Sequence, residues 1–441
     1  MLAGRSAKGA VVEAKGRTVR PAEEIACTFP PVRRAALLLA AALLPAGARA
    51  GEPVESPRLT PEGPAARPIP SLDLPEWLGQ VTGLSPAPRP EKKEEAPPGR
   101  LRLDLVPFVI SNPLIGVGGG IAMAGAFRLG HASSTSFSSF ALSGILTTNG
   151  QRGLNVRSQL RLPDNDWLLV GDWALVHWPG PAWGVGSDTP DSNETMVDRR
   201  EVKFHETAFR RLSGPLYAGI GYFLDDEYDI SDTGAKGGGP SAFSQYPYGT
   251  SGRWISSGFT ANLLWEGRDN PVNPWKGFYA LARLRLGPEE AGTDQAWQSV
   301  WVEERTYLPL GRANTLALWA YGWSAFGKVP WFSLPANGRD PEHRSGRGWI
   351  EARHVGKDLL GAEAEWRVAI WEFVSATAGV NVHAVSDRTS DAQWPTFPTW
   401  HPAAVAGLRL TLDRRSMTCL TLDGAVRPGG FTGYINFNEA F

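Results

Sequence analysis

Strict alternation of apolar and polar residues is the feature that most constrains how this chain can fold. In residues 361–371, apolar side chains occupy the even positions, and the odd positions include Glu363, Glu365 and Arg367. The same alternation recurs at residues 215–225, 373–385 and 417–426. A period of two residues is typical of a β-strand with one apolar and one polar face. Because turn-rich stretches separate these runs, residues 101–441 are predicted to be all-β.

Alternation fits either a soluble β-sandwich or a membrane barrel, and two observations favour the barrel. Charged residues lie in the middle of a run on one face, as they do in a polar lumen. Aromatic residues gather near the ends of runs, as in the girdles at a membrane interface. They are Trp167, Trp173, Trp178, Trp319, Tyr321, Trp323, Tyr434 and Phe437. We therefore predict a transmembrane antiparallel β-barrel of about sixteen strands, although about twelve strands with longer loops also fit the length.

Composition and motif content exclude several other classes of protein. The chain of 441 residues carries a formal net charge of −1, unlike a basic nucleic-acid-binding protein. No run approaches the ~18 apolar residues of a membrane-spanning helix. The seven histidines show no metal-ligand spacing. The glycine-rich residues 116–120 lack the helix and the Lys-Ser/Thr pair of a nucleotide-binding loop. We expect no cofactor, no metal site and no enzymatic activity.

Residues 1–50 end in a pattern typical of a secretory signal peptide. Arg33 and Arg34 precede an apolar run over residues 35–44, and Ala48-Arg49-Ala50 fits a small-residue cleavage site. A short buried helix is the alternative interpretation of the apolar run. The sequence therefore predicts export, with cleavage after Ala50.

The stretch ahead of Arg33 is longer than an ordinary signal-peptide start. One hypothesis is that translation begins at Val32, so that residues 1–31 are not part of the natural protein. Cleavage after Ala50 would remove Cys27 and leave Cys419 as the remaining cysteine. We therefore expect neither an intrachain disulfide nor a cysteine metal site.

Residues 51–100 have the composition of a linker. They contain twelve prolines and a charged cluster at residues 91–95. Such a segment cannot bury a core, so a disordered or extended periplasmic linker is predicted. Residues 72–84, with Leu74 and Trp77, either form a short amphipathic helix that plugs a lumen or touches a partner, or remain a transient turn.

Two motifs resemble those of a known family of barrels. Residues 265–279 are similar to the Asp-x-Arg-Asp-Asn and Pro-x-x-Gly hairpin of the BamA/TamA family, the bacterial surface antigen barrels. Residues 345–349 resemble the Arg-Gly-aromatic tip of that family's long sixth extracellular loop. Two positions differ from the family pattern, because Glu266 replaces an aspartate and Gly346 an apolar residue. The matching residues are Arg268, Asp269, Asn270, Pro274 and Gly277 in the hairpin, and Arg347, Gly348 and Trp349 in the loop.

The resemblance implies a role for the loop tip. In that family the tip folds back into the lumen, where its arginine pairs with acidic residues of the inner wall. A confined guanidinium needs a carboxylate, and the alternation predicts Glu365 and Asp423, ahead of Glu363, as partners of Arg347. A flexible, solvated loop is the alternative. In the hairpin, Arg268 and Asp269 are expected to pair across the base of the turn.

The last run of alternation, residues 431–441, ends in Phe441. This residue resembles the terminal phenylalanine that insertion machinery reads in the last strand of outer-membrane barrels. Glu439 departs from that pattern, because an apolar residue is usual at its position. With the first strand expected at residues 101–109, a lateral seam would join the first and last strands.

The resemblance also guides the functional expectation. Assembly and secretion members of the family carry POTRA domains, and residues 51–100 are too short to hold one. We expect a short member without POTRA domains in the bacterial outer membrane, which inserts or translocates a substrate through the barrel or its lateral seam. A passive diffusion channel and a structural or surface-antigen protein are the alternatives. Expected partners are outer-membrane lipid and lipopolysaccharide, the assembly machinery for its own insertion, and an unfolded protein or lipid substrate, but no nucleic acid.

Overall fold

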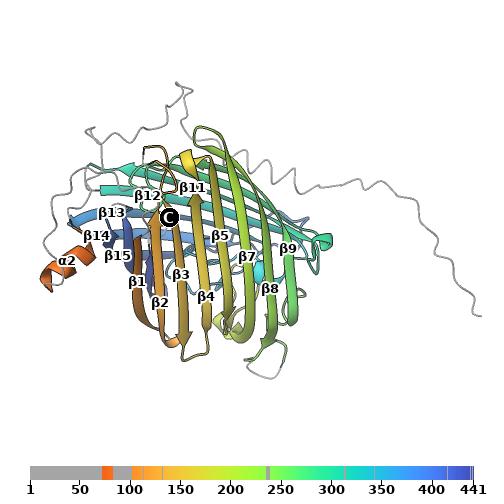
Figure 1. Cartoon of the computed structure of the whole chain (residues 1–441). Coiled ribbons are helices and arrows are strands. Elements are labelled where there is room, and N and C mark those ends of the chain that lie inside the picture. The colour runs from red at the N-terminus through yellow and green to blue at the C-terminus, as the bar shows by residue number, and fades with distance from the viewer. Residues whose placement is uncertain are drawn as a thin grey trace, which may run out of the picture.

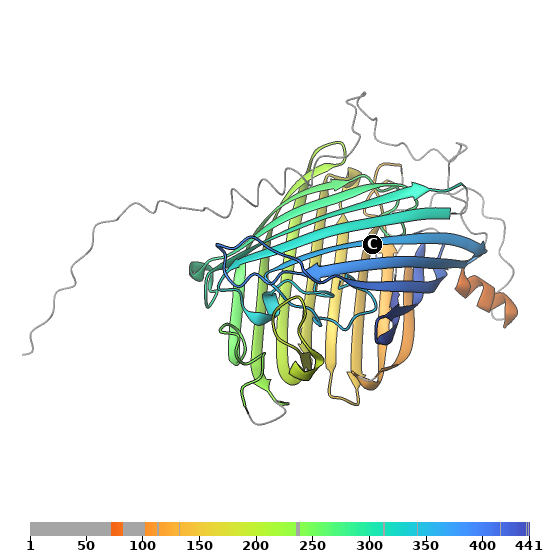
Figure 2. The ribbon, with the colours of Figure 1, turned by 180° about the vertical axis from the view of Figure 1, so that it is seen from behind.

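The computed structural model describes residues 72–82 and 102–441, apart from residues 113, 132, 235–238, 312–313, 342, 415, 438 and 440. The predicted signal peptide and most of the predicted linker lie outside these residues. The described part forms one antiparallel sheet that curls into a barrel (Figures 1 and 2). Its elements are α2 (Leu74–Val81), β1 (Arg102–Asn112), β2 (Gly116–Phe127), β3 (Ser138–Thr147), β4 (Arg152–Arg161), β5 (Trp167–His177), β6 (Gly180–Ala182), β7 (Thr195–Ser213), β8 (Leu216–Asp232), β9 (Gly252–Glu266), β10 (Gly277–Gly287), β11 (Trp297–Pro309), β12 (Asn314–Gly327), β13 (Asp358–Trp371), β14 (Val374–Val385), β15 (His401–Asp413), β16 (Thr418–Arg427) and β17 (Gly430–Phe437).

The strands follow one another around the sheet in chain order. Each long strand pairs antiparallel with the next, from β1 with β2 to β16 with β17. The three-residue β6 pairs with the start of β7, whose remaining length pairs with β5. The described sheet therefore has seventeen strands. Because β5 and β6 both pair with β7, they occupy one position in the barrel wall, so the layout matches the predicted sixteen-strand barrel. No register joins β1 to β17 among the described residues, so the sheet curls round without pairing its two edges.

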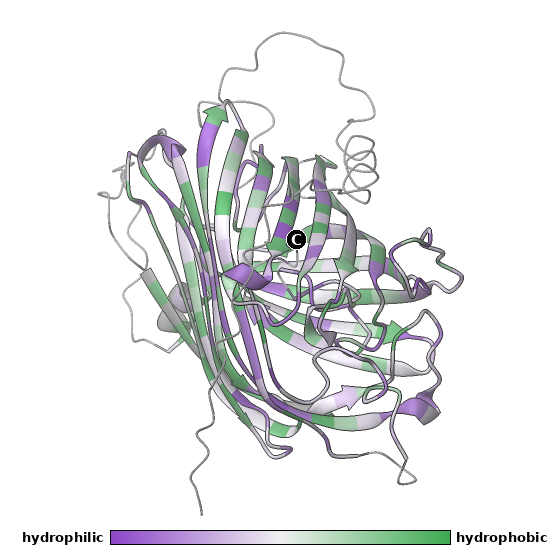
Figure 3. Ribbon diagram, turned by 90° about the vertical axis from the view of Figure 1, so that its right-hand side faces the viewer, coloured by the Kyte–Doolittle hydropathy of each residue, from purple (hydrophilic) through white to green (hydrophobic). Residues whose placement is uncertain are grey.

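The predicted alternation is confirmed by the register and the exposure of the side chains. Glu363 and Glu365 on β13 face the interior, while Trp366 and Ile370 are 48% and 62% exposed on the outer surface. Hydrophilic and hydrophobic bands alternate along the strands in Figure 3. One face of each strand therefore lines a lumen and the other faces outward.

The predicted aromatic girdle is wrong for part of the chain. Trp167 and Trp173 are exposed on the outer face, as expected. Trp319 and Tyr321 are instead buried inside the barrel, because Trp319 is in register with inward-facing Glu363. The hydroxyl of Tyr434 also lies in the lumen, where it accepts a hydrogen bond from the loop tip. The position of an aromatic residue near the end of a strand therefore does not indicate whether its ring faces outward or into the lumen.

The connections differ at the two rims. Residues 178–194, 233–251, 328–357 and 386–400 form long connections at one rim, while several connections at the other rim are tight turns. Strand β1 begins and strand β17 ends at the tight-turn rim. This is expected for a barrel with an even number of strand positions and short turns on the inner side of the membrane.

Helix α2 lies at the tight-turn rim, outside the barrel wall (Figure 1). Its Trp77 ring is 5.5 Å from the ring of Phe373, in the turn between β13 and β14. The amphipathic helix is therefore present, and it packs on the rim rather than in the lumen. No helix in the described ranges is long and apolar enough to cross a membrane.

Candidate functional site

The loop between β12 and β13, residues 328–357, brings the Arg-Gly-Trp motif against the inner wall. Arg347 is only 5% exposed, whereas a solvated loop tip would leave its guanidinium in water. Gly346 and Gly348 on either side have φ values of +65° and +100°. Glycine adopts such positive φ angles without the steric cost of a Cβ atom, so the two glycines allow the sharp turn that presents Arg347 to the wall.

The Arg347 guanidinium contacts all three acidic side chains that the sequence suggested. Its Nε donates to Glu363 Oε1 at 2.8 Å, and its Nη2 donates to Glu365 Oε2 at 2.5 Å. Its Nη1 donates to Asp423 Oδ2 at 3.1 Å. Glu363 and Glu365 point the same way because they are two residues apart on β13. Asp423 reaches them from β16, across two intervening strands.

Three charged residues that the sequence analysis missed extend this cluster. Arg367 donates to Glu365 Oε1 at 2.8 Å, and Arg409 bonds both Asp423 and Glu439. The period-two pattern places Arg367 on the same face as Glu365, so its presence could have been inferred. Nothing in the local sequence indicates that Glu439, beyond the end of β17, turns inward to meet Arg409. Each carboxylate of this group has an arginine partner, which offsets the cost of burying its charge.

Backbone contacts also hold the loop tip. Gly348 donates its N–H to the Tyr434 hydroxyl at 2.7 Å, and its carbonyl accepts from Thr432 at 3.2 Å. Asn381 donates to the carbonyl of Arg347 at 2.9 Å. Because Tyr434 and Thr432 lie on β17, the tip is bonded to the last strand of the sheet as well as to β13 and β14.

Trp349 packs beside three histidines at the long-loop rim. Its ring centroid lies 4.7 Å from His354 and 5.2 Å from His401. His354 and His383 share a hydrogen bond of 2.8 Å, and His401 is bonded to the carbonyl of Ser187. Burial, reinforced by the two neighbouring histidines, lowers the pKa of His354 on the loop. The three imidazole rings pack around the ring of Trp349.

Gly348→Ala is expected to loosen the docked tip and to lower stability by about 1–3 kcal/mol. An added Cβ would lie 2.8 Å from the Ala403 Cβ, and φ would remain +100°. Ala403→Gly in the same chain should restore part of the loss, because it removes the clash but not the backbone strain. Gly429→Ala is the matched control, since Gly429 has φ of +78° with no atom within 4 Å. The measurement is the thermal midpoint of the folded barrel. Equal losses for both alanine variants would contradict the packing argument.

The hairpin motif forms the turn between β9 and β10 at the tight-turn rim. Arg268 binds Glu266 through both ends of its guanidinium, with Nε to Oε1 at 2.8 Å and Nη2 to Oε2 at 2.6 Å. Arg161 at the end of β4 adds a bond of 2.8 Å to the same carboxylate. The predicted partner of Arg268, Asp269, is therefore wrong, because Arg268 pairs with Glu266 instead. Glu266 faces the same lumen space as Arg268, whereas Asp269 lies in the turn itself.

Asp269 and Asn270 shape the turn through the backbone. Asp269 Oδ1 accepts from the N–H groups of Asn270, Trp275 and Lys276, and Asn270 Oδ1 accepts from Val272. These are the local bonds for which Asp and Asn are favoured in turns. Pro274 follows within this turn. Gly277 closes it with φ of +119°, where an added Cβ would lie 2.3 Å from the Gly267 carbonyl oxygen.

The same turn reaches across the mouth of the barrel. Asn270 Nδ2 donates to the carbonyl of Ser416 at 3.0 Å, and Asn273 Nδ2 lies 3.5 Å from the carbonyl of Met417. Residues 416 and 417 belong to the turn between β15 and β16, five strands further round the sheet from β10. The hairpin motif therefore spans the tight-turn end of the lumen.

Phe441 does not close the last strand, contrary to the sequence prediction. Strand β17 ends at Phe437, and Phe441 is buried with its ring 5.3 Å from that of Trp319. Arg367 donates to the Phe441 carbonyl at 2.9 Å. The inward turn follows from Glu439, whose carboxylate finds arginine partners in the lumen that an outward-facing position would not offer. The role of Phe441 as an insertion signal remains a prediction.

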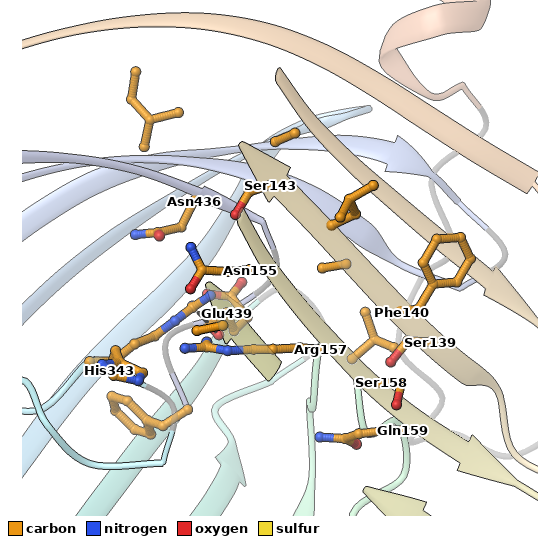
Figure 4. A pocket seen from close by; sticks show the side chains of 18 of the residues that line it. Ser139, Phe140, Ser143, Asn155, Arg157, Ser158, Gln159, His343, Asn436 and Glu439 are labelled. Atoms are coloured by element: carbon orange, nitrogen blue, oxygen red, sulfur yellow. Dashed lines mark hydrogen bonds between the residues drawn. The ribbon is translucent and has the colours of Figure 1, made fainter. Parts of the chain in front are cut away.

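A cavity of about 530 Å³ remains in the lumen beside the first strands (Figure 4). The inner faces of β2 and β3 carry small residues, such as Ala122, Ser139 and Ser143, which leave this side of the lumen unfilled. Figure 4 shows Arg157 extending from β4 toward His343 of the long loop. The charged cluster around Arg347 lies on the β12–β17 side, and the cavity lies between the wall of β2–β5, the long loop and the end of β17.

Comparisons with known proteins leave the sequence without a match. No family model and no curated protein matches the chain. Solved structures similar to it include BamA from Haemophilus ducreyi lacking POTRA domains 1–3, at 13% identity and a TM-score of 0.45, covering 76% of this chain and 69% of that one. CdiB from Acinetobacter baumannii has 13% identity and a TM-score of 0.44, covering 77% and 56%. CdiB from Escherichia coli has 12% identity and a TM-score of 0.48, covering 78% and 62%. The chain spans less than two thirds of either CdiB chain.

Proposed function

We propose that this protein is a barrel of the bacterial outer membrane that inserts or translocates a substrate through its lumen and the seam between β1 and β17. The observation that carries the proposal is the seam itself. The described edges of β1 and β17 share no register, although every other pair of neighbouring long strands does. An unpaired edge in hydrocarbon leaves backbone groups without partners, so a seam of this kind favours the entry of another chain or amphiphile.

The position of the cavity supports the same proposal. Its lining includes Phe108 on β1 and Asn436 on β17, and also Leu420 and Ile435, which alternation places on the outer face of the last strands. A cavity bordered by both inward and outward residues of these strands communicates with the seam. The motif resemblance to the BamA/TamA family adds a second line of support.

A passive diffusion channel is the second candidate, and the cavity beside β2–β5 is the observation that favours it. The loop tip and the hairpin turn oppose it, because each occupies part of the lumen. The two candidates predict different currents in a planar bilayer. The proposed function requires a silent or flickering protein, whereas a large steady single-channel conductance would overturn it in favour of the channel.

Labelling of the seam provides a second readout. Ile435→Cys and Val380→Cys place a thiol on outward positions of β17 and β14, while native Cys419 is buried. With the barrel in lipid vesicles, a bulky water-soluble maleimide should modify Ile435→Cys at least about tenfold faster than Val380→Cys, because the seam admits water and the closed wall does not. Equal rates at the two positions would mean that the seam is sealed in the membrane.

A further inference from the structure

Three histidines from separate segments of the chain meet where the docked loop contacts the barrel wall. His354 belongs to the long loop, His383 lies near the end of β14, and His401 begins β15. The ring centroids are 3.4 Å apart for His354 and His401, 5.0 Å for His354 and His383, and 5.3 Å for His383 and His401. All three residues are at most 8% exposed. One buried contact between the loop and the wall thus contains three of the seven histidines in the chain.

The hydrogen bonds inside this cluster depend on the protonation of the rings. His354 Nδ1 and His383 Nε2 are 2.8 Å apart. One of these nitrogens donates and the other accepts, so the bond is lost when both rings carry a proton on each nitrogen. His383 Nδ1 is buried without a hydrogen-bond partner among the described residues. An N–H group of a charged ring at that position would have no acceptor, which is costly in a buried site.

The charged groups that face the cluster cannot neutralise three added positive charges. Arg353 and Arg427 interact electrostatically with the loop histidine and disfavour its charged form. Arg353 is bonded to Asp191 at 2.8 Å. Asp188, in the connection between β6 and β7, interacts with the histidine at the start of β15 and favours its charged form. A single carboxylate of this kind offsets one imidazolium group and leaves two without a partner.

The direction of the pH effect follows from the difference between the docked and the released loop. Burial, followed by the neighbouring histidines and arginines, lowers the pKa of docked His354, whereas a solvated histidine has a pKa of about 6.5. The released loop therefore binds more protons than the docked loop at acidic pH, and falling pH favours release. A histidine that stays neutral while docked shifts this equilibrium by up to about 30-fold at about pH 5.

We propose that His354, His383 and His401 form a pH-sensitive latch, which holds the loop tip in the lumen at neutral pH and releases it when the long-loop rim is acidified. The proposal rests on the proposed function and names the regulation of the same lumen. Charged rings 3.4 Å apart would repel one another, and His354 is the member carried by the loop. Its movement would withdraw the ring of Trp349, which packs 4.7 Å away, and with it the tip that carries Arg347.

Current through the barrel and hydrogen exchange of residues 345–357 test the latch. The natural chain should be silent or flickering at about pH 7.5 and conduct at least about tenfold more when the long-loop side is brought to about pH 5. Exchange in residues 345–357, corrected for the intrinsic effect of pH, should accelerate over the same range. The folded band on an unheated gel at each pH shows that the barrel itself persists.

Variants separate the histidines from the carboxylates around Arg347. His354→Phe keeps a ring beside Trp349 but takes up no proton, so its barrel should stay closed and its loop protected at both pH values. His401→Phe is the second variant, in case the first loosens the loop at neutral pH, and it should shift the midpoint of opening to lower pH. His131→Gln is the matched control, because His131 is exposed and lies outside the cluster. It should behave like the natural chain.

Two results would overturn the latch. The first is a natural chain whose current and loop exchange do not change with pH, and silent bilayers would then leave the proposed function intact. The second is acid opening that persists in His354→Phe with a loop docked at neutral pH, or an unshifted midpoint in His401→Phe. A large steady current at neutral pH would overturn the proposed function instead. Hydrogen exchange would still show whether acid releases the loop, so the two failures are distinguishable.

Discussion

Arg347→Ala is expected to lower the free energy of unfolding of the barrel by about 3–5 kcal/mol, the usual cost of removing one partner from a buried ionic cluster. The substitution leaves Glu363, Glu365 and Asp423 buried with less positive charge near them. Arg367 and Arg409 remain close to two of these carboxylates but do not replace the bond of 2.8 Å from Arg347 to Glu363. Glu363 should therefore bear most of the penalty.

The same variant should also change the behaviour of the pore. Once the tip is released, loop residues 328–357 no longer fill the β12–β17 side of the lumen, and current through the barrel should rise. Refolding yield and single-channel conductance measure the two effects. Arg253→Ala is the matched control, because the side chain of Arg253 is 63% exposed and its ion pair with Asp226 should contribute less than about 1 kcal/mol. Unchanged yield and conductance for Arg347→Ala would rule out the plug.

The parts of the site that sequence could predict are those fixed by the two-residue period. Glu363 and Glu365 share a face because they are two residues apart on one strand, and Asp423 faces the same way on its own strand. Given a barrel, these three side chains must point into one lumen. Arg347 was identified from its motif, because the two-residue period applies to strands and makes no prediction for a loop.

The parts that sequence could not predict depend on contacts across the barrel. Arg268 meets Arg161 around Glu266 because the turn after β9 and the end of β4 face one another across the lumen. Likewise Glu439 reaches Arg409 by leaving the line of β17. Both contacts need the curvature of the whole sheet, which the local pattern does not encode. The inward position of Trp319 was missed because the outward residues beside it are also apolar.

Arg268→Ala should cost about 3 kcal/mol of stability, since it removes a two-pronged bond to buried Glu266 and the contact of the guanidinium with the Tyr279 ring, 4.5 Å away. Arg268→Lys should recover little, because an ammonium group cannot reproduce the planar two-pronged geometry. Lys276→Ala, an exposed position in the same turn, should leave the thermal midpoint unchanged. A lysine variant as stable as the natural chain would contradict the importance of that geometry.

Combining Arg268→Ala with Glu266→Gln should cost less than the two single losses together, because the double variant leaves neither charge buried without its principal partner. The remaining charge of Arg161 sets the limit of this recovery. Purely additive losses would mean that the pair is not energetically coupled.

Arg347 holds the loop tip within the lumen, and Arg268 holds the turn across its tight-turn end. This arrangement gives the most demanding test. Arg347 and Arg268 share no ion-pair partner, so their stability losses should add. Their effects on current should not add, because either remaining obstruction limits flow through the barrel. Each single variant should flicker, and a chain carrying both substitutions should conduct steadily. If the double variant conducts no more than the better single variant while remaining folded, then the hairpin turn and the loop tip do not act as successive obstructions.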